Sequence, residues 1–531
     1  MNAENTAVER ARELFRAGRY AEAESTLTTA FRNGLVPGAS AFWLLADIEK
    51  ELGHPEREIR ALEGLLAVFR ADDDTVIGRL WARAAMLRER LGDPDGALAA
   101  WKSAVGTAPD IPELHRGLAR ARLNAQEIAG VAVSASELLN RFPRHVFSHV
   151  YHGHMKKALG DRAAAAASYR HALVLDPGCG EALYNLAEMH QADGSESLLT
   201  QATELVNRED AAAADLINAA FAAARVLDRE GRFRQALDYL ALANQWAQSE
   251  CERRGLRYDR DAEEASVARI MSDYPRTAFD TAIGSLPIEL VPIFVIGPPR
   301  SGTTLIEQIL SCHSQVEAAG EITAAPRCES AFRRARSAAG RDGPLDPADA
   351  TDAELLENAR ERYIDALFER GLSGPRVVDK LPANFRIAGF LRAMFPDSPI
   401  VHCVRDLRAT GFSLYNANFG AHEPWYHDLG HIAHYLRLYR KLMSHWQDVL
   451  DPPCIDVSYE QLVANPEKQI AVLLENADLP FEPACLEFYR NDRPVLTASH
   501  EQVRQPAYTS AIDHWRNYSD WLGPVAELPP R

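Results

Sequence analysis

Two patterns of apolar and polar residues divide the chain near residue 250. In the first half, apolar helical segments are separated by a glycine, a short polar turn and an alanine, as in Gly92-Asp-Pro-Asp-Gly-Ala97. In the second half, short β-branched runs alternate with helix-like segments. The first pattern predicts stacked pairs of helices, and the second predicts a parallel sheet covered by helices.

The turn of the first half recurs at a regular interval. Gly18, Gly92, Gly160 and Gly231 are spaced by about 70 residues, close to twice the ~34-residue period of tetratricopeptide repeats, and Gly53 fills one gap. Each glycine is expected to end a helix in a left-handed cap. The segment resembles tetratricopeptide repeats over residues 5–250, with degenerate units around 110–150 and 195–215. The resemblance implies a superhelical solenoid with a concave side; a generic helical bundle is the alternative.

Strand and helix segments alternate through the second half. Strands are predicted around 293–296, 377–378, 400–404 and 454–457, followed by helices over 303–312, 384–395, 407–418 and 460–476. Residues 337–352 predict a mobile surface loop leading into a helix at 353–370. The predicted fold is an α-solenoid joined to an α/β P-loop-like domain with a central parallel sheet. The expected divisions are a solenoid at 1–250, a connecting helical segment at 251–290 and the α/β domain at 291–531.

Composition narrows the class of protein. Of 531 residues, 47% are hydrophobic and the formal net charge is −17, which excludes general disorder and argues against nucleic acid as a partner. Seven scattered cysteines without a CxxC pair fit a reducing compartment. Neither a signal peptide nor a long uncharged apolar stretch is recognised, so no membrane association and a cytoplasmic location are expected.

A phosphate-binding loop is the sharpest chemical signal. In Ile293-Phe-Val-Ile-Gly297-Pro-Pro-Arg300-Ser301-Gly302-Thr303-Thr304-Leu305, a buried strand enters a glycine-bearing loop and then an apolar helix. Backbone N–H groups of such a loop and of the helix N-terminus bind phosphate. The glycines have the GxxxxGK[ST] spacing, but Thr303 replaces the lysine that neutralises nucleoside triphosphates. A plain strand–turn–helix is the alternative.

The loop resembles the 5′-phosphosulfate loop of sulfotransferases that use 3′-phosphoadenosine 5′-phosphosulfate (PAPS), most of all the tyrosylprotein branch and its bacterial relatives fused to tetratricopeptide repeats. The resemblance covers about residues 290–525. It implies that PAPS is the sulfuryl donor, that no metal is needed, and that the loop holds the donor through these residues: Pro299, Arg300, Ser301, Gly302, Thr303 and Thr304.

Further motifs receive roles from this resemblance. Arg405, at the end of a predicted strand, and Ser413 match the pair that holds the 3′-phosphate, although an Arg405–Asp406 surface pair is the alternative. Glu321 matches the base that removes the proton from the acceptor hydroxyl. Lys380 matches the lysine that neutralises the leaving oxygen, with Arg300 stabilising the same region, and a surface lysine paired with Asp379 is the alternative.

The C-terminal segments match less completely. Tyr459 is a candidate adenosine contact or only a core aromatic residue, and the segment from Ser499 through Gln502, Val503 and Arg504 resembles a lid over the donor. Ala417 stands where the tyrosylprotein branch has a further arginine, and His514 stands where it has a lysine. Arg504 or Arg516 is expected to supply the missing charge. The histidines at 422, 427, 431 and 434 have helical spacing without a supporting carboxylate or cysteine framework, so no metal site is predicted.

The expected function is therefore transfer of a sulfuryl group from PAPS to an acceptor hydroxyl. A protein tyrosine, a carbohydrate and a small alcohol all remain open as acceptors, and the solenoid is expected to bind a protein or peptide partner. A P-loop kinase-like nucleotide enzyme and an inactive scaffold are the alternatives. The sequence leaves a homodimer open.

Overall fold

The computed structural model describes residues 3–69, 74–124, 127–189, 195–281, 290–491 and 503–530. The lid residues Ser499 and Gln502 lie outside these ranges. The chain divides into two compact units, Met1–Met155 and Lys156–Arg531. The second unit combines the later repeat helices with the α/β domain, whereas the boundaries expected at residues 250 and 290 stay predictions.

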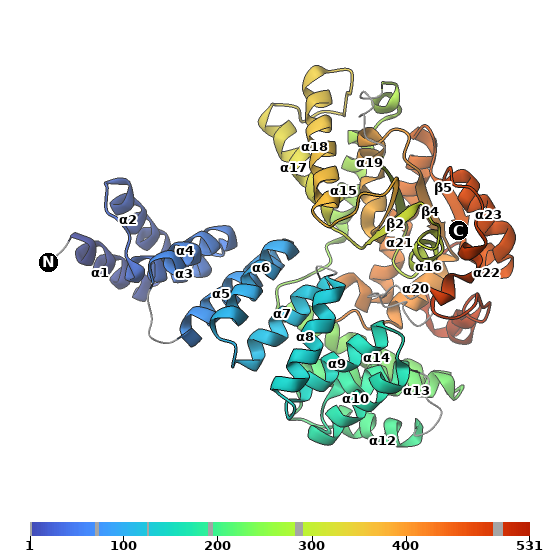
Figure 1. Cartoon of the computed structure of the whole chain (residues 1–531), viewed down its shortest axis with the longest axis horizontal. Helices are drawn as coiled ribbons and strands as arrows, with labels where there is room; N and C mark the ends of the chain where they lie inside the picture. Colours follow the sequence, from blue (N-terminus) through green and yellow to red (C-terminus); the bar gives the residue numbers. More distant parts are fainter. Residues whose placement is uncertain are drawn as a thin grey trace. The chain divides into compact units, whose positions relative to one another are not determined.

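Helix pairs build the first unit (Figure 1). The helices are α1 (Ala3–Arg16), α2 (Tyr20–Arg32), α3 (Ala39–Leu52), α4 (Pro55–Val68), α5 (Asp74–Arg90), α6 (Pro94–Thr107), α7 (Pro112–Asn124), α8 (Ile128–Arg141) and α9 (Val146–Ala158), the last of which runs into the second unit. Apolar clusters join successive pairs, for example Leu27 with Ile48 and Trp101 with Leu118. All five repeat glycines have the expected positive φ, between 70° and 81°.

The second unit opens with further repeat helices: α10 (Arg162–Leu175), α11 (Gly180–Glu188), α12 (Ser195–Val206), α13 (Ala213–Arg229) and α14 (Phe233–Arg253). α15 (Arg260–Asp273) and a 3₁₀ turn, Arg276–Phe279, lead toward the sheet. No helix among the described residues combines the length and apolar character that a membrane span requires.

A five-stranded parallel sheet forms the centre of the α/β domain, in the order β2-β3-β1-β4-β5. The strands are β1 (Val291–Ile296), β2 (Val316–Gly320), β3 (Arg376–Lys380), β4 (Ile400–Val404) and β5 (Ile455–Ser458). Four of them confirm the predicted strands. Alternation along β1 sends Ile293 and Val295 into one buried cluster and Phe294 and Ile296 into another, so both faces of the sheet are covered.

The helices of the α/β domain are α16 (Thr303–Leu310), α17 (Ala324–Ala338), α18 (Ala350–Phe368), α19 (Ala388–Met394), α20 (Leu407–Tyr415), α21 (Leu429–Val449), α22 (Tyr459–Ala464) and α23 (Pro466–Asn476). All but α17 and α21 fall on the predicted helical segments. The helix predicted at 460–476 is two helices because Pro466, which has no N–H to donate, starts a new one. The helix predicted at 384–395 begins as a 3₁₀ turn, Pro382–Ile387.

One hydrophobic core joins the last repeat helices to the sheet domain. Phe221 and Leu227 of α13 and Leu240 of α14 belong to the same buried cluster as Phe412 and Trp446. Asn244 of α14 reinforces this packing, because its Nδ2 donates to the carbonyl of Tyr415 at 2.9 Å. The last repeat helices, α13 and α14, therefore pack as part of the sheet domain.

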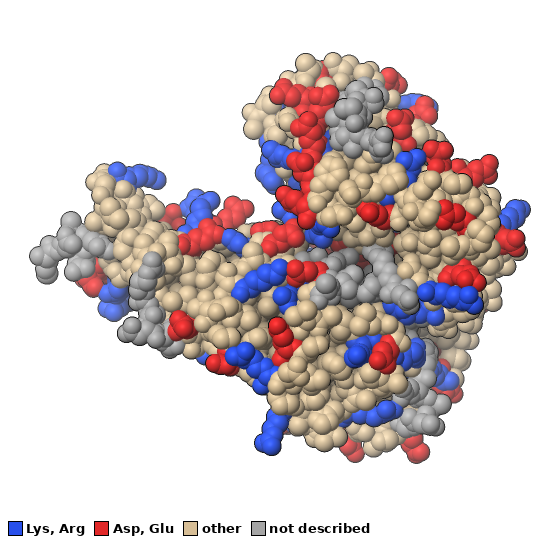
Figure 2. Space-filling view, in the orientation of Figure 1, with Lys and Arg blue, Asp and Glu red and all other residues tan. Residues whose placement is uncertain are grey.

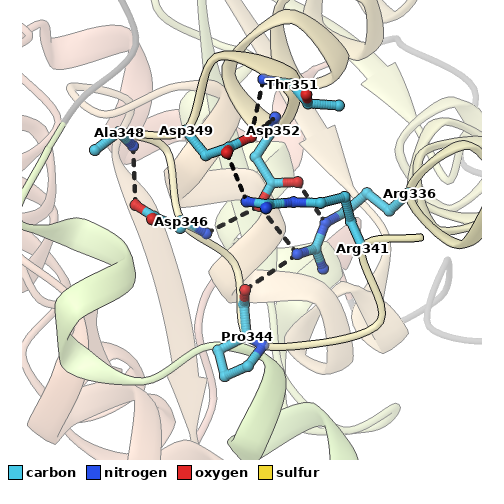
Figure 3. Close-up of polar contacts among 8 residues, drawn as sticks. All are labelled: Arg336, Arg341, Pro344, Asp346, Ala348, Asp349, Thr351 and Asp352. Carbon is cyan, nitrogen blue, oxygen red and sulfur yellow. Dashed lines mark hydrogen bonds and ion pairs between the residues drawn. The ribbon is translucent and has the colours of Figure 1, made fainter. Parts of the chain in front are cut away.

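The loop between α17 and α18 is fastened by a buried ion pair (Figure 3). Arg336 Nε donates to Asp352 Oδ1 at 2.8 Å, and its Nη2 donates to the Pro344 carbonyl at 3.1 Å. The backbone N–H of Asp346 donates to the other Asp352 oxygen at 3.1 Å. The predicted helix at 353–370 is α18 and starts at Ala350.

Charge is mixed on the surface. On the face drawn in Figure 2, acidic and basic side chains are interspersed rather than gathered into a single basic field. Five arginines line a cavity of the second unit that is partly open to solvent, described next.

Candidate functional site

Three neighbouring strands end at one edge of the sheet, and each delivers a predicted site segment there. β1 enters the glycine loop, β3 ends on Lys380, and β4 is followed at once by Arg405. The parallel register sets Val295 beside Lys380, and the Gly297 N–H donates to the Pro382 carbonyl at 3.2 Å. Ligands of parallel α/β sheets bind at this carboxyl edge.

The loop adopts a conformation that few sequences allow. Gly297, Arg300 and Gly302 have φ values of 147°, 70° and 108°. Positive φ is strained for a residue with a Cβ, so Arg300 is a backbone outlier at the predicted site. Ser301 is fully buried, and its hydroxyl donates to the Pro298 carbonyl at 2.7 Å. That hydroxyl therefore shapes the loop in this structure.

Donor groups converge beyond the loop. Thr303 and Thr304 form the first turn of α16, whose leading N–H groups have no acceptor within the helix. Pro299 is half-buried in the turn before Arg300. These features suit an anion near Gly302, as the sequence predicted, while the individual contacts assigned to the loop residues stay predictions.

Arg300, Arg405 and Ser413 meet in three dimensions. Arg300 Nε donates to Ser413 Oγ at 3.0 Å, and Arg405 Nη1 donates to the Arg300 carbonyl at 2.7 Å. A second Arg405 nitrogen donates to the Ala511 carbonyl at 2.9 Å. The alternative Arg405–Asp406 pair is not observed, because Asp406 caps α20 and binds Arg408.

Arg405 keeps one donor available. Its Nε is buried and has no hydrogen-bond partner among the described residues. A buried unpaired donor is costly unless a ligand or water completes it. The guanidinium also lies 4.5 Å from the centre of the Tyr459 ring. The donor set therefore fits a phosphate-bearing nucleotide, which is the group that the resemblance implies.

A small cavity, partly open to solvent, lies over the loop. Arg300, Gly302, Arg405 and Tyr459 line it, and so does Val503 of the predicted lid. Its apolar wall was missed by the sequence interpretation and consists of Leu305, Val463, Phe488, Ala507 and Tyr508. An apolar wall beside arginines suits a ligand with a planar base and charged phosphates.

A second, larger cavity shares Arg300, Arg405 and Tyr459 with the first and extends to the repeat helices. Ser413 lines it, together with three arginines that the sequence analysis did not single out: Arg162, Arg225 and Arg229. These come from α10 and α13. Sequence could not reveal them, because nothing in a repeat motif indicates which helix face meets a distant domain.

The predicted base and the predicted cation contact each other. Lys380 is fully buried, and its Nζ donates to Glu321 Oε1, whose side chain is 35% exposed. Glu307 of α16 lies on the other side, with Oε2 3.6 Å from Lys380 Nζ. Glu307 was not predicted; a lone acid in the apolar segment Thr303–Leu310 is the signal that could have indicated it.

Next to this group, Asp379 is buried and accepts from the Tyr363 hydroxyl at 2.9 Å. Burial raises the pKa of Asp379 to about 7, a rise that the Tyr363 hydrogen bond only partly offsets. Asp379 does not pair with Lys380 as a surface residue would, so the surface-lysine alternative for Lys380 is not supported.

Other predicted residues lie elsewhere. Arg504 Nη2 donates to the Ala158 carbonyl at 2.6 Å, and Arg516 pairs with Asp513 at 2.6 Å; neither lines the cavity with Ser413. His514 does line it, bound to Asp228 at 3.0 Å. Within the described ranges, no group of three or more His, Cys, Asp and Glu side chains is placed to hold a metal ion.

Comparison with known proteins gives two family matches. Residues 292–483 match the model described as "Sulfotransferase family", and residues 8–74 and 83–130 match "Tetratricopeptide repeat". The chain thus contains tetratricopeptide repeats and a sulfotransferase-family domain.

Individual relatives extend the comparison. An uncharacterized protein of Aquifex aeolicus is 30% identical over 74% of this chain and 51% of its own length. Protein-tyrosine sulfotransferase 1 of Danio rerio is 28% identical over 42% of this chain and 65% of its own. The sulfotransferase domain of the Synechococcus PCC 7002 olefin synthase is 20% identical over 45% of this chain and 89% of that one, with a TM-score of 0.32. The chain thus spans about half the length of the Aquifex protein.

Proposed function

We propose that the sulfotransferase-family domain transfers a sulfuryl group from PAPS to the hydroxyl of an acceptor. The observation that carries this proposal is the convergence of the Gly297–Thr304 loop, Lys380 and Arg405 at the carboxyl ends of β1, β3 and β4. The sulfotransferase family match covers the same three segments. PAPS supplies an activated sulfuryl group joined to a phosphate that can leave.

Binding at the loop orients the donor. The N–H groups that begin α16 and the Arg300 guanidinium hold the 5′ end, while Arg405 and Ser413 hold the 3′-phosphate. The unpaired Arg405 Nε is satisfied by this second phosphate. Tyr459 and the apolar wall of the smaller cavity receive the adenine. Fixing both ends of the donor turns a chance encounter into a positioned attack.

Glu321 takes the proton of the acceptor hydroxyl as the new oxygen–sulfur bond forms. The bond between sulfur and the 5′-phosphate oxygen breaks, and that oxygen leaves with the electron pair. Lys380 offsets its growing charge, and so does Arg300 after its Nε releases Ser413 Oγ, to which it donates in this structure. Because Lys380 is bound to Glu321 in this structure, it must release Glu321 as it turns to the leaving oxygen, and Glu307 keeps a carboxylate beside the ammonium meanwhile.

The comparisons favour one chemical class of acceptor. Relatives named protein-tyrosine sulfotransferases favour a protein tyrosine, and tetratricopeptide repeats favour a protein or peptide partner. An acceptor screen with radiolabelled PAPS on peptides, oligosaccharides and small alcohols separates these classes. A cytoplasmic location, independence of metal ions and a homodimer also stay proposals.

Two measurements test the activity. Thermal unfolding of the full chain with adenosine 3′,5′-bisphosphate should show stabilisation that ATP with Mg²⁺ does not give; stabilisation by ATP with Mg²⁺ alone would instead support a kinase. Transfer of ³⁵S from PAPS should then fall at least 100-fold in Glu321→Gln and in Lys380→Ala. Undiminished transfer in both variants would remove the roles assigned to them.

A further inference from the structure

The larger cavity gathers basic side chains in a chain whose net charge is −17. Five arginines line it, against the two carboxylates Glu188 and Asp228. Three of the five arginines belong to the repeat helices and two to the sheet domain. Arg225, Arg300 and Arg405 are half-buried, so bringing their charges together is favourable when an anionic ligand balances them.

Two of the repeat arginines have evident structural roles. Arg162 donates to the Met189 carbonyl, and Arg229 Nη1 donates to the Ala187 carbonyl at 2.6 Å. Both carbonyls lie at the C-terminus of α11 (Gly180–Glu188), where a helix leaves carbonyls unpaired and favours cations. Binding a ligand is not needed to explain them.

Arg225 has a different environment. Its Nε lies 2.6 Å from Glu188 Oε1, and its side chain is 21% exposed. Burial opposes its charge, but the Glu188 carboxylate raises the pKa of Arg225, so it stays protonated. Conversely, after burial, Arg225 is the largest charge that lowers the pKa of Arg300, ahead of Arg405. Arg225 and Arg300 line the same cavity, where their like charges disfavour each other.

Helix α13 places Arg225 in the lining of the cavity that also contains Ser413 and Arg405. Asn218, Arg225 and Arg229 are seven and four residues apart, so at 100° per residue they lie within about 20° of one helix face. Near one end of this face Asn418 donates to Asn218 at 2.7 Å, just beyond α20. Near the other end Asp228 binds His514 and Tyr518, and the Tyr518 ring stacks on Phe412 of α20.

This placement answers a question that the sequence left open. Ala417, where the tyrosylprotein branch has an arginine, is buried and cannot contribute charge to the 3′-phosphate. We propose that Arg225, from the last part of the repeat region, binds the 3′-phosphate of the donor together with Arg405 and Ser413. The inference rests on the proposed function, and it makes the repeats part of the donor site as well as a partner-binding surface.

Loss of Arg225 should weaken only nucleotides that carry a 3′-phosphate. A charge-assisted hydrogen bond to phosphate contributes enough that its loss weakens binding about 10- to 100-fold. Arg225→Gln should therefore weaken adenosine 3′,5′-bisphosphate by this factor and leave adenosine 5′-monophosphate within about twofold of its original affinity. Damage to the fold would weaken both nucleotides alike.

The experiment is calorimetric titration of the full chain with these two nucleotides. Arg208→Gln is the matched control, because Arg208 lies on the repeat side, pairs with exposed Asp210 and does not line the cavity. Glu188→Gln is the second variant. It removes the anion that competes for Arg225, so it should leave 3′,5′-bisphosphate binding unchanged or tighten it. Thermal unfolding of each variant verifies that it is folded.

The outcomes are separable. If Arg225→Gln weakens both nucleotides equally, or leaves the 3′,5′-bisphosphate unaffected, the role of Arg225 is wrong while the proposed function stands. If Glu188→Gln weakens the bisphosphate as much as Arg225→Gln does, the ion pair is purely structural and the inference also falls. If the unmodified chain binds neither nucleotide, both the inference and the proposed function are wrong.

Discussion

Gly302 offers a direct test of how the loop is built. A Cβ at this position would lie 2.7 Å from Cδ2 of Tyr459 and 3.4 Å from Sγ of Cys403. Carbon atoms prefer about 3.5–4.0 Å, so in Gly302→Ala the Tyr459 ring must move by about 1 Å. The backbone is also unfavourable for alanine, because φ is +108°.

Two costs combine in this variant. The positive φ costs about 1–3 kcal/mol. Displacing the ring weakens its contact with the Arg405 guanidinium, 4.5 Å from the ring centre, by about 0.5–2 kcal/mol. We expect Gly302→Ala to lower the free energy of unfolding by about 2–4 kcal/mol. The displaced Tyr459 ring also lines the smaller cavity, so we expect Gly302→Ala to weaken adenosine 3′,5′-bisphosphate about tenfold, or about 1.4 kcal/mol.

Gly255→Ala is the control for backbone strain alone. Gly255 has φ +76°, a Cβ added there would meet no atom within 4 Å, and the residue lies outside both cavities. It should cost about 1–2 kcal/mol and leave nucleotide binding unchanged. Urea unfolding and calorimetric titration measure both quantities.

The tyrosine provides the decisive comparison. In a Tyr459→Ala background the clash is gone, so Gly302→Ala should cost only the backbone strain, and a double-mutant cycle should give a coupling of about 1 kcal/mol or more. If Gly302→Ala and Gly255→Ala lose equal stability, and Gly302→Ala binds the nucleotide normally, the close contact with Tyr459 has no role in shaping the site.

Two further predictions concern the interior. Burial raises the pKa of Asp379 to about 7, so between about pH 4 and 7 the folded protein holds a proton on Asp379 that the unfolded chain has lost. The contribution of Asp379 to the free energy of unfolding therefore falls as pH rises through this range. Urea unfolding measured across this pH range should show a flatter dependence in Asp379→Asn, and parallel profiles for the two proteins would contradict the assignment. Phe221 is fully buried in the core shared with the sheet domain, so Phe221→Ala should lower the free energy of unfolding by about 3–5 kcal/mol. Circular dichroism should show the repeat helices and the sheet domain of the second unit unfolding in one transition. A sheet domain that unfolds as before in this variant would show that the two parts fold separately.

Much of the fold was predictable because it depends on local signals. The repeat glycines indicated the helix ends, and the β-branched runs indicated four of the five strands. β2 was missed because Val316-Glu-Ala-Ala-Gly320 lacks a β-branched run, and it forms a strand through pairing with β3. Pairing with a neighbour is tertiary information that a short segment does not carry.

The site was predictable where one motif supplies several groups. Arg300 and Gly302 in the loop, and Arg405 and Ser413 after β4, are brought together as the motifs indicated. Glu307 was missed because its partner Lys380 is distant in sequence, and the loop between α17 and α18 depends on Arg336 reaching Asp352. In each case the sequence does not indicate which two charged side chains pair in the folded protein.

Arg225 shows how far such non-local information reaches. A boundary at residue 250 follows from the change of sequence pattern, but α13 lies before that boundary, α14 extends across it, and both share the hydrophobic core of the sheet domain. Once a repeat helix packs into the core of the sheet domain, its arginine can provide the charge that is missing at Ala417, just after α20. Alanine at position 417 and the packing of α13 are then linked. Without an arginine at 417, the 3′-phosphate can be held only where α13 supplies Arg225. An arginine introduced at Ala417 should accordingly restore binding of adenosine 3′,5′-bisphosphate to Arg225→Gln in part; if it restores none, the two positions do not serve the same phosphate.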